Sequence, residues 1–353
     1  MPKSKRSAEP SLSRLARIVR SFSRCRLGVV GDWMLDRYVW GNASRLSPEA
    51  AVPVVDFVEE SSVLGGAGNV AANLVALGAR VVPFGAAGKD ADADSLRAMV
   101  RGLEMPEKGI VEDASRPTTV KTRIIARHQQ IVRVDREARA PLHPDVEELL
   151  VRRIMASLST LHALVLSDYD KGVITEGLPA RVLGACQKLK VPAFVKPKWS
   201  RLPTYPGATV IVLNRQEAGF LVTRTLDDDE SIEEAGRALL AHFACPAVII
   251  TRGEKGMSLL QQDAPRALHI PPTNHEAPMG RLGQKAAHPS SGRQVFDVTG
   301  AGDTVLATLA LAVAAGAPLW DAAFLANAAA GVVVGKLGTA TVSPAELLVA
   351  LRD

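Results

Sequence analysis

Short apolar runs recur along the chain. They occupy residues 27–31, 79–84, 163–166, 193–195, 209–213 and 247–250. Segments with the apolar spacing of amphipathic helices separate most of these runs. Strands that alternate with helices predict an α/β fold, with a doubly wound, mostly parallel sheet and helices on both faces. Because ligands bind at the carboxyl ends of strands in such sheets, the residues after each run are candidate site residues.

Two stretches, 51–59 and 118–135, depart from this alternation. Both are rich in β-branched residues, and the second has the pattern of a hairpin that turns near 127–130. They predict a small β-sheet lid beside the main sheet, formed by segments about 37–60 and 117–135. One face of so small a sheet stays exposed unless something covers it, so we expect a homodimer that packs through the lid.

Positive charge is concentrated at the N-terminus. The chain has a net charge of +5, and residues 1–26 hold eight basic residues against the single acid Glu9. The remaining body therefore carries a net charge of about −2, which argues against a nucleic-acid surface spread over the fold. Residues 11–22 place apolar side chains at helical spacing, so we expect a basic extension that contains a first helix.

The sequence favours a cytoplasmic protein. The most apolar stretch, 304–317, is shorter than the roughly 20 residues that span a bilayer, so it predicts a buried helix and no membrane association. No apolar signal segment follows the N-terminal charges. The three cysteines, Cys25, Cys186 and Cys245, are far apart and have no zinc-type spacing, which is typical of a reduced compartment.

The strongest candidate for chemistry is segment 296–304, directly before an apolar helical stretch. Gly300, Ala301 and Gly302 begin that stretch, where free backbone N–H groups and the helix dipole attract an anion such as phosphate. A carboxylate beside a phosphate is electrostatically unfavourable, so Asp303 suggests a base that takes a proton from an attacking hydroxyl during phosphoryl transfer. A glycine-rich turn with Asp303 as a helix N-cap explains the pattern equally well.

A second glycine-rich segment, 64–73, precedes another helical stretch. Gly65 and Gly66 allow a polar ligand to approach the backbone, and the Asn69 amide offers a donor and an acceptor to hydroxyl groups. The chain contains no Walker loop, because no G-x-x-x-x-G-K-[ST] string occurs in it. A bound phosphate must therefore be held in another way.

The order and spacing of these segments resemble the ribokinase-like (PfkB) carbohydrate kinase family from residue 27 to about 344. The resemblance also rests on residues that follow apolar runs, at 31–36, 214–217 and 251–256. Longer strings resemble the D-glycero-β-D-manno-heptose 7-phosphate kinases, at 31–41, 45–55 and 167–172. The resemblance implies one ribokinase-like kinase domain over 27–353, after the basic extension 1–26 and with an irregular insertion at about 264–294.

The resemblance implies a reaction as well. It is the ATP-dependent phosphorylation of the anomeric hydroxyl of heptose 7-phosphate to the 1,7-bisphosphate, in the synthesis of ADP-heptose for the lipopolysaccharide core. A kinase of another sugar or sugar phosphate is the main alternative, and a non-catalytic sugar-phosphate-binding relative is a further one. The nucleotidyltransferase half that is fused in some relatives is missing from the sequence, so we expect a separate protein to supply that step.

On the sugar side, the resemblance assigns roles to individual residues. Asp303 matches the catalytic base, and residues 300–302 match the anion hole for the transferred phosphoryl group. The positions that match sugar contacts are Asp32, Asp36, Gly65, Gly66 and Asn69. A phosphate dianion needs cations, and the candidates at lid or strand-end positions are Lys121, Arg123 and Lys171.

On the nucleotide side, the resemblance implies ATP as co-substrate with Mg²⁺. Asn214 and Glu217 match an N-x-x-E motif that helps to hold the Mg²⁺-nucleotide, with Glu217 acting indirectly, since Mg²⁺ keeps several waters. The other nucleotide positions are Lys198, Thr251, Arg252, Gly253 and Asn327. Asp297 and Thr299 match a monovalent-cation loop, which makes K⁺ a further candidate ion.

Two features depart from the heptose kinases. Where those enzymes usually have Asp-Pro-Lys-Gly, this chain has Lys196 and Trp199 at the first and last positions. The change replaces an acid near the phosphates with a base, and a glycine with a bulky ring. The insertion at 264–294 is also longer than in the family and directly precedes the catalytic segment.

Overall fold

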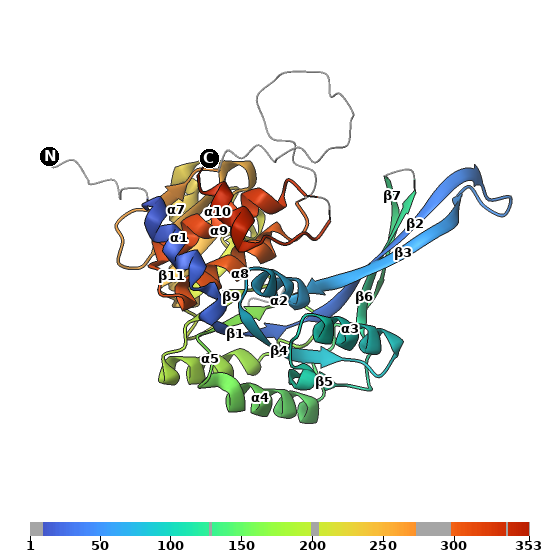
Figure 1. Cartoon of the computed structure of the whole chain (residues 1–353), viewed down its shortest axis with the longest axis horizontal. Helices are drawn as coiled ribbons and strands as arrows, with labels where there is room; N and C mark the ends of the chain where they lie inside the picture. The colour runs from blue at the N-terminus through green and yellow to red at the C-terminus, as the bar shows by residue number, and fades with distance from the viewer. Residues whose placement is uncertain (1–9, 127–128, 199–204, 273–297, 337, 353) are drawn as a thin grey trace, which may run out of the picture.

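The computed structural model describes residues 10–126, 129–198, 205–272, 298–336 and 338–352. Within these residues the chain forms two β-sheets, a large one covered by helices and a small one that projects from it (Figure 1).

The large sheet has nine strands in the described part of the chain. In spatial order they are β13 (Leu268–Ile270), β12 (Met257–Gln261), β11 (Ala247–Thr251), β10 (Val210–Asn214), β9 (Ala193–Lys196), β8 (Ala163–Ser167), β1 (Arg26–Gly31), β4 (Arg80–Ala87) and β5 (Ile110–Glu112). The strands from β11 to β5 are parallel to their neighbours, whereas β12 and β13 pair antiparallel. The six predicted strands all form, and the prediction of a mostly parallel α/β sheet is confirmed.

The central strands are apolar because both of their faces are buried. All five residues of β8 are buried, and Leu164 and Leu166 pack into one apolar cluster while Val165 packs into the other. This alternation between two covered faces is the reason for the continuous apolar runs in the sequence.

Helices form the layer on each face, with α2 and α8 on one side and α4 and α5 on the other (Figure 1). Buried residues of the first cluster come from α1 (Leu12–Arg20), α2 (Ala67–Ala76), α3 (Ala91–Gly102), α8 (Ala301–Ala314), α9 (Leu319–Val333) and α10 (Pro344–Ala350). Those of the second come from α4 (Pro144–Leu158), α5 (Leu178–Leu189), α6 (Arg215–Leu221) and α7 (Asp229–Phe243). Short 3₁₀ helices are η1 (Phe22–Arg24), η2 (Glu107–Gly109) and η3 (Gly253–Lys255).

The helix expected in the basic N-terminal segment is α1. Leu15, Ile18 and Val19 are buried in the cluster that α8 and α9 also line, and Arg14 forms a 2.6 Å ion pair with the buried Asp321 of α9. This part of the basic segment is therefore packed onto the folded body through an apolar stripe.

The apolar stretch at 304–317 forms most of α8, as predicted for a buried helix. Every residue from 303 to 312 is buried, so the apolar composition serves the core. Among the described residues, none of the helices combines the length and apolarity needed to cross a bilayer. The three cysteines are free and buried.

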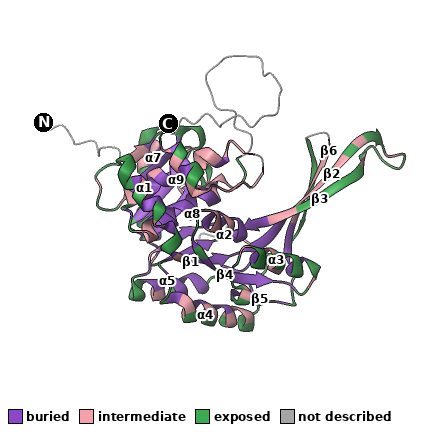
Figure 2. Cartoon of the chain, in the orientation of Figure 1, coloured by how far each residue is buried: buried purple, intermediate pink, exposed green. Residues whose placement is uncertain are grey.

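The small sheet is the lid. Its strands are β3 (Pro53–Gly66), β2 (Trp33–Leu46), β6 (Thr119–Ala126) and β7 (Gln129–Arg136), in that spatial order. β2 begins directly after Asp32, so the lid is continuous with the central strand β1. β6 and β7 form the expected hairpin, whose turn at 127–128 lies outside the described residues. The base of the lid is buried and its outer half is exposed (Figure 2), which confirms a separate β-sheet lid.

The prediction that 264–294 contains no regular element is wrong for its first part. Leu268–Ile270 form β13 at the edge of the large sheet, where Ile270 pairs with Met257 of β12. Three residues carry too little alternation to predict a strand, and β13 exists because the edge of β12 offers free backbone groups. Residues 273–294 lie outside the described residues.

Candidate active site

The carboxyl ends of the parallel strands bring several predicted residues to one edge of the sheet. In the strand register, Gly31 lies beside Ser167, and Ser167 lies beside Lys196. Farther along the same edge, Asn214 lies beside Thr251. Residues that are more than 200 positions apart in the sequence therefore line one edge, where ligands bind in sheets of this class.

The glycine-rich segment at 300–302 begins α8. Gly300 is the N-cap residue, with a left-handed φ of +82°, and a Cβ atom at this position would lie 2.7 Å from Asn69 Nδ2. Glycine is therefore required both by the backbone conformation and by the close approach of Asn69. The side chain of Asp303 does not cap the helix, because α8 has no side-chain cap. The alternative in which Asp303 is only an N-cap is therefore wrong.

The Asp303 carboxylate is 4% exposed and accepts hydrogen bonds from three side chains. Asn69 Nδ2 donates to Oδ2 over 2.9 Å, while Tyr169 Oη and Lys196 Nζ donate to Oδ1 over 2.6 and 2.8 Å. Charge-assisted bonds of this kind fix the direction of a buried carboxylate and balance its charge. The arrangement provides an oriented acid/base group at the start of a helix.

A chain of hydrogen bonds holds Asn69 in place. Asn73 Nδ2 donates to the Asn69 backbone oxygen over 2.9 Å, and Thr304 Oγ1 donates to Asn73 Oδ1 over 2.9 Å. Asn73 and Thr304 are completely buried. The two glycine-rich segments found in the sequence are thus joined, because α2 and α8 pack together through this chain.

Asp32 organises the loop that follows β8. Its carboxylate accepts backbone hydrogen bonds from Tyr169 over 2.8 Å, from Lys171 over 3.2 Å and from Val173 over 3.1 Å. Burial, and to a lesser extent the charge of Asp168, raises the pKa of Asp32 to about 6, because these two effects outweigh the opposite effect of the three N–H groups. Asp32 is therefore central to the site, and it positions the loop that carries Tyr169 and Lys171.

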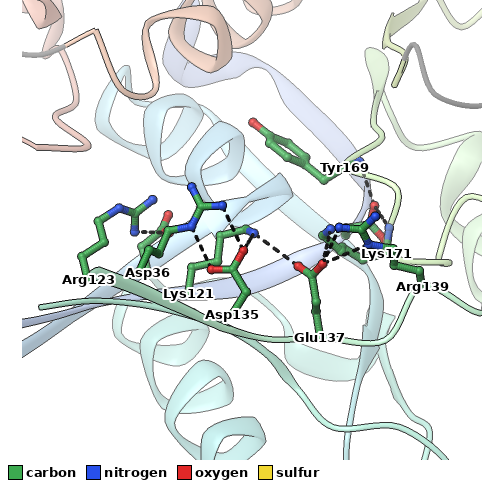
Figure 3. Close-up of polar contacts among 10 residues, drawn as sticks. Asp36, Lys121, Arg123, Asp135, Glu137, Arg139, Tyr169 and Lys171 are labelled. Atoms are coloured by element: carbon green, nitrogen blue, oxygen red, sulfur yellow. Dashed lines mark hydrogen bonds and ion pairs between the residues drawn. The ribbon is translucent and has the colours of Figure 1, made fainter. Parts of the chain in front are cut away.

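At the base of the lid, Asp36 pairs with Arg123. Arg123 Nη1 donates to Asp36 Oδ1 over 2.6 Å, so a predicted sugar contact and a predicted phosphate contact bind each other (Figure 3). A Cβ atom on Gly65 would lie 2.3 Å from Asp36 Oδ2, and one on Gly66 would lie 2.5 Å from the Asp32 backbone oxygen. These two glycines give the two carboxyl-bearing residues the room they need.

The other two predicted phosphate cations share one carboxylate, that of Glu137. Lys171 Nζ lies 2.8 Å and Lys121 Nζ 3.3 Å from Glu137 oxygens, and Lys121 also lies 3.0 Å from Asp135 (Figure 3). Burial alone would raise the pKa of Glu137, but hydrogen bonds from Lys171 and Arg139 and the charge of Lys121 hold it below its usual range. The Glu137 carboxylate thus lies between Lys121 of the lid and Lys171 of the loop that follows β8.

The predicted nucleotide residues Asn214 and Glu217 form a capping box at the start of α6. Asn214 Oδ1 accepts from the Glu217 backbone N–H, and Glu217 Oε2 accepts from the Asn214 backbone N–H, both over 2.8 Å. Thr251 lies beside Asn214, and its hydroxyl donates to the Leu213 backbone oxygen over 3.5 Å. Gly253, two residues farther on, has a left-handed φ of +60°.

The remaining nucleotide predictions fall in different surroundings. Arg252 forms a 2.6 Å ion pair with Asp229 and donates a 3.3 Å hydrogen bond to Ser258. Its guanidinium therefore connects α7 to β12. Asn327 of α9 donates to the Pro271 backbone oxygen over 2.8 Å. Lys198 follows β9 and is half-buried.

The predicted monovalent-cation pair is described only in part. Thr299 is exposed and directly precedes Gly300, whereas Asp297 lies outside the described residues, as does Trp199. The sequence therefore remains the basis for this cation site.

Sequence reasoning missed Tyr169 and Glu137 as residues of the site, and it missed the contact that Lys196 makes with Asp303. Tyr169 donates to Asp303, and its pKa is raised by burial and by the Asp303 charge, so the phenol stays protonated. Its only signal was its place in the string 167–172. Lys196 stood out as a departure from relatives, but nothing in the sequence linked it to Asp303. Glu137 carried no signal, because its role depends on two lysines that fold next to it.

Known proteins resemble this chain in sequence and in fold. The pattern described as "pfkB family carbohydrate kinase" matches residues 26–346. The "Bifunctional protein HldE" of Geobacter sulfurreducens is 47% identical over 320 residues, which cover 91% of this chain and 61% of that protein. The protein of the same name from Mesorhizobium japonicum is 41% identical over 342 residues, 97% of this chain and 65% of the relative. The chain thus spans about three fifths of the length of these curated relatives.

Solved structures share the fold at low sequence identity. Arabidopsis thaliana ribokinase, complexed with ribose and ATP, has a TM-score of 0.69 at 19% identity and covers 93% of this chain and 99% of its own. Escherichia coli phosphofructokinase-2 in complex with potassium has a TM-score of 0.70 at 16% identity, with 93% and 98% covered. Together with the family match over nearly the whole chain, these findings establish that the chain belongs to the pfkB family of carbohydrate kinases.

Proposed function

We propose that this kinase transfers the γ-phosphoryl group of ATP to the anomeric hydroxyl of D-glycero-D-manno-heptose 7-phosphate, giving the 1,7-bisphosphate. The observation that carries the choice of a phosphorylated sugar is the carboxylate of Glu137 between Lys121 and Lys171. The strings at 31–41, 45–55 and 167–172, which resemble heptose 7-phosphate kinases, support the choice of a heptose.

Asp303 acts as the base in this reaction. Among the described residues its Oδ1 accepts two hydrogen bonds and its Oδ2 accepts one, so Oδ2 keeps acceptor capacity for the sugar hydroxyl. As the hydroxyl oxygen bonds to the γ-phosphorus, its proton passes to Oδ2 and the bond to the ADP oxygen breaks. The backbone N–H groups at the start of α8 stabilise the charge on the transferred group.

The 7-phosphate binds to the cations that Glu137 and Asp135 occupy in the free protein. Lys171 and Lys121 lie at hydrogen-bonding distance from these carboxylates, so the two ammonium groups already converge on a common anion. A phosphate dianion makes stronger charge-assisted contacts than a carboxylate and replaces it. Arg123, paired with Asp36, completes the cationic side of the lid.

ATP binds along the edge formed by Asn214, Glu217, Thr251 and Gly253, with Lys198 and Asn327 at its borders. Among the described residues there is no group of three or more metal-ligating side chains, and Glu217 keeps one carboxylate oxygen outside the capping box. This donor set fits Mg²⁺, which prefers phosphate oxygens and waters with few carboxylates. When bound, the ion supplies positive charge to the phosphates, with Glu217 holding it through water.

A monovalent cation near Thr299 and Asp297 is part of the proposal. Its support is the sequence resemblance of these residues to a cation loop and the related phosphofructokinase-2 structure in complex with potassium. We place the reaction in the cytoplasm, where ATP is available and cysteines such as the three free ones of this chain remain reduced.

The lid provides a surface for a second copy of the chain. Its outer strands expose Phe57 by 66%, Val58 by 58%, Val132 by 45% and Val134 by 54%. Apolar side chains gathered on one small sheet are typical of a protein–protein interface. We therefore propose a homodimer that packs through the lid.

The direct test is ADP release with a panel of acceptors in the presence of Mg²⁺, with and without K⁺. The panel contains heptose 7-phosphate, the same heptose without phosphate, fructose 6-phosphate, ribose and no sugar. We expect fast release with heptose 7-phosphate only. Fast ADP release with a different sugar would show that the proposed substrate is wrong. ADP release at the same rate with and without sugar would overturn the assignment as a sugar kinase.

A further inference from the structure

Lys196 is the last residue of β9 and lies at the centre of the site. Its Nζ is 2.8 Å from Asp303 Oδ1 and 3.4 Å from Tyr169 Oη, and it lies over the Tyr169 ring at 5.3 Å from the centroid. Its side chain is 19% exposed, so the ammonium group is largely removed from solvent. The Lys196 ammonium group is thus in direct contact with Asp303, the proposed base, and this contact requires a physical explanation.

The ammonium group also lies against the anion hole. A Cβ atom on Gly302 would be only 3.2 Å from Lys196 Nζ, so the amine lies beside the first turn of α8. Burial lowers the pKa of Lys196, but the charge and hydrogen bond of Asp303, together with the charge of Glu217, outweigh it and hold the pKa above the usual range. The amine is therefore charged, with the base on one side and the Asn214–Glu217 motif within electrostatic reach.

The same ion pair opposes catalysis in the free protein. An ammonium group bonded to Asp303 stabilises the carboxylate and so weakens it as a proton acceptor. When a polyanionic nucleotide arrives, the γ-phosphoryl oxygens compete for the ammonium group. Nζ carries three protons and donates one to Asp303 and one, over 3.4 Å, to Tyr169, so the third is available to a phosphoryl group at the start of α8.

We propose that Lys196 is a catalytic residue that binds the γ-phosphoryl group of the nucleotide and stabilises its charge during transfer. The proposal rests on the proposed kinase function. Before nucleotide binds, Asp303 holds the ammonium group beside the anion hole. Once nucleotide is bound, the ammonium group is shared with the phosphoryl oxygens, and Asp303 is released to accept the hydroxyl proton. Lys196 keeps its own protons throughout, so no further co-reactant is needed.

The competing explanation is that Lys196 and Asp303 form a purely structural ion pair. The two explanations differ in whether the contribution of Lys196 to nucleotide affinity depends on the γ-phosphate. The test uses the Asp303→Asn protein, in which turnover and the ion pair are both removed. Isothermal titration calorimetry with Mg²⁺ compares the affinity for a non-hydrolysable ATP analogue with that for ADP. The measurement is repeated after adding Lys196→Met, and after adding Lys188→Met as a control at an exposed position on α5.

We expect Lys196→Met to weaken binding of the ATP analogue about tenfold or more, the size of a lost charge-assisted contact, and to leave ADP affinity nearly unchanged. Lys188→Met should alter neither affinity. Equal losses for the two nucleotides, or no loss, would overturn the role of Lys196 and leave the kinase proposal intact. Failure of the Asp303→Asn protein to bind either nucleotide would overturn the kinase proposal along with it.

Kinetics in the otherwise native protein give a second readout. Lys196→Met should lower kcat about 10²- to 10³-fold, as the loss of one transition-state donor does, with little change in KM for the sugar. Lys196→Arg keeps the cation and should restore part of kcat, while thermal unfolding checks that both variants fold. A folded Lys196→Met protein with native kcat would contradict the proposal.

Discussion

The edge of the large sheet and the lid both pair cations with carboxylates of the chain, but they do so on different supports. Lys196 and Asp303 are carried by β9 and α8, which are buried on the large sheet. Lys121 and Asp135 are carried by β6 and β7, and every residue of β7 is exposed. Segments with few buried contacts open at lower free energy than core elements. We therefore expect the edge of the large sheet to carry out the chemistry, and the lid, which opens more easily, to bind the sugar phosphate.

Asp32 and Asp36 show the same contrast within four positions of the sequence. Asp32 is fixed by three backbone N–H groups of the body, whereas Asp36 is held by Arg123 of the lid. Substitutions on the two sides should therefore affect different steps: turnover on the sheet edge and substrate affinity on the lid.

The largest effect should come from Asp303→Asn on the sheet edge. Loss of the base should lower kcat about 10³-fold, within the range for general-base catalysis, while both substrates still bind. Steady-state kinetics and calorimetry measure the two quantities, with the exposed Asp94→Asn as a control. A kcat close to that of the native protein would remove Asp303 from the mechanism.

The double substitution Lys121→Met with Lys171→Met tests the lid side. Losing two charge-assisted contacts should lower kcat/KM for heptose 7-phosphate roughly 10²-fold. The loss should be in KM, and the affinity for ATP should not change. A loss confined to kcat would show that these lysines take part in the chemistry. It would contradict the assignment of turnover to the sheet edge and of substrate affinity to the lid.

The pH dependence of stability tests the burial of Asp32. Its pKa is raised from about 3.8 to about 6, so the folded protein binds this proton more tightly than the unfolded chain. The resulting stability is fully present below pH 4 and is lost as the pH rises through 6, by roughly 2–3 kcal/mol. Denaturant unfolding between pH 4 and 8 should show this slope in the native protein and not in Asp32→Asn. Parallel curves would contradict the raised pKa.

Glu137→Gln should have a smaller effect in the opposite direction from the lysine changes. A neutral amide competes less with phosphate for Lys121 and Lys171, so KM for heptose 7-phosphate should fall severalfold. KM for ATP is the internal control. A higher KM for the sugar phosphate would show that Glu137 supports the substrate instead of occupying its place.

The smallest effect on turnover should come from the outer lid. Phe57→Ser should shift the protein from dimer to monomer in sedimentation equilibrium, because Phe57 is a large exposed apolar side chain on the proposed interface. Leu189→Ser, at an exposed position on α5, is the matched control. A native protein that sediments as a monomer would remove the dimer from the account.

The sequence predicted what local patterns encode. Apolar runs predicted the central strands, a glycine-rich helix start placed Asp303, and β-branched stretches predicted the lid. The strand β13 was not predicted, because three residues carry almost no periodic signal. Contacts such as Lys196 to Asp303 join residues 107 positions apart and arise from packing, and the sharing of Glu137 by Lys121 and Lys171 arises in the same way. Such contacts could not be derived from spacing along the chain.

The most direct test of the central claim is phosphorus NMR of the product formed from ATP and heptose 7-phosphate. The account predicts one new anomeric phosphate resonance per ATP consumed by the native protein, with the 7-phosphate retained, and no such resonance with Asp303→Asn over the same time. Release of inorganic phosphate in place of the new resonance, or a phosphate on another hydroxyl, would contradict the account.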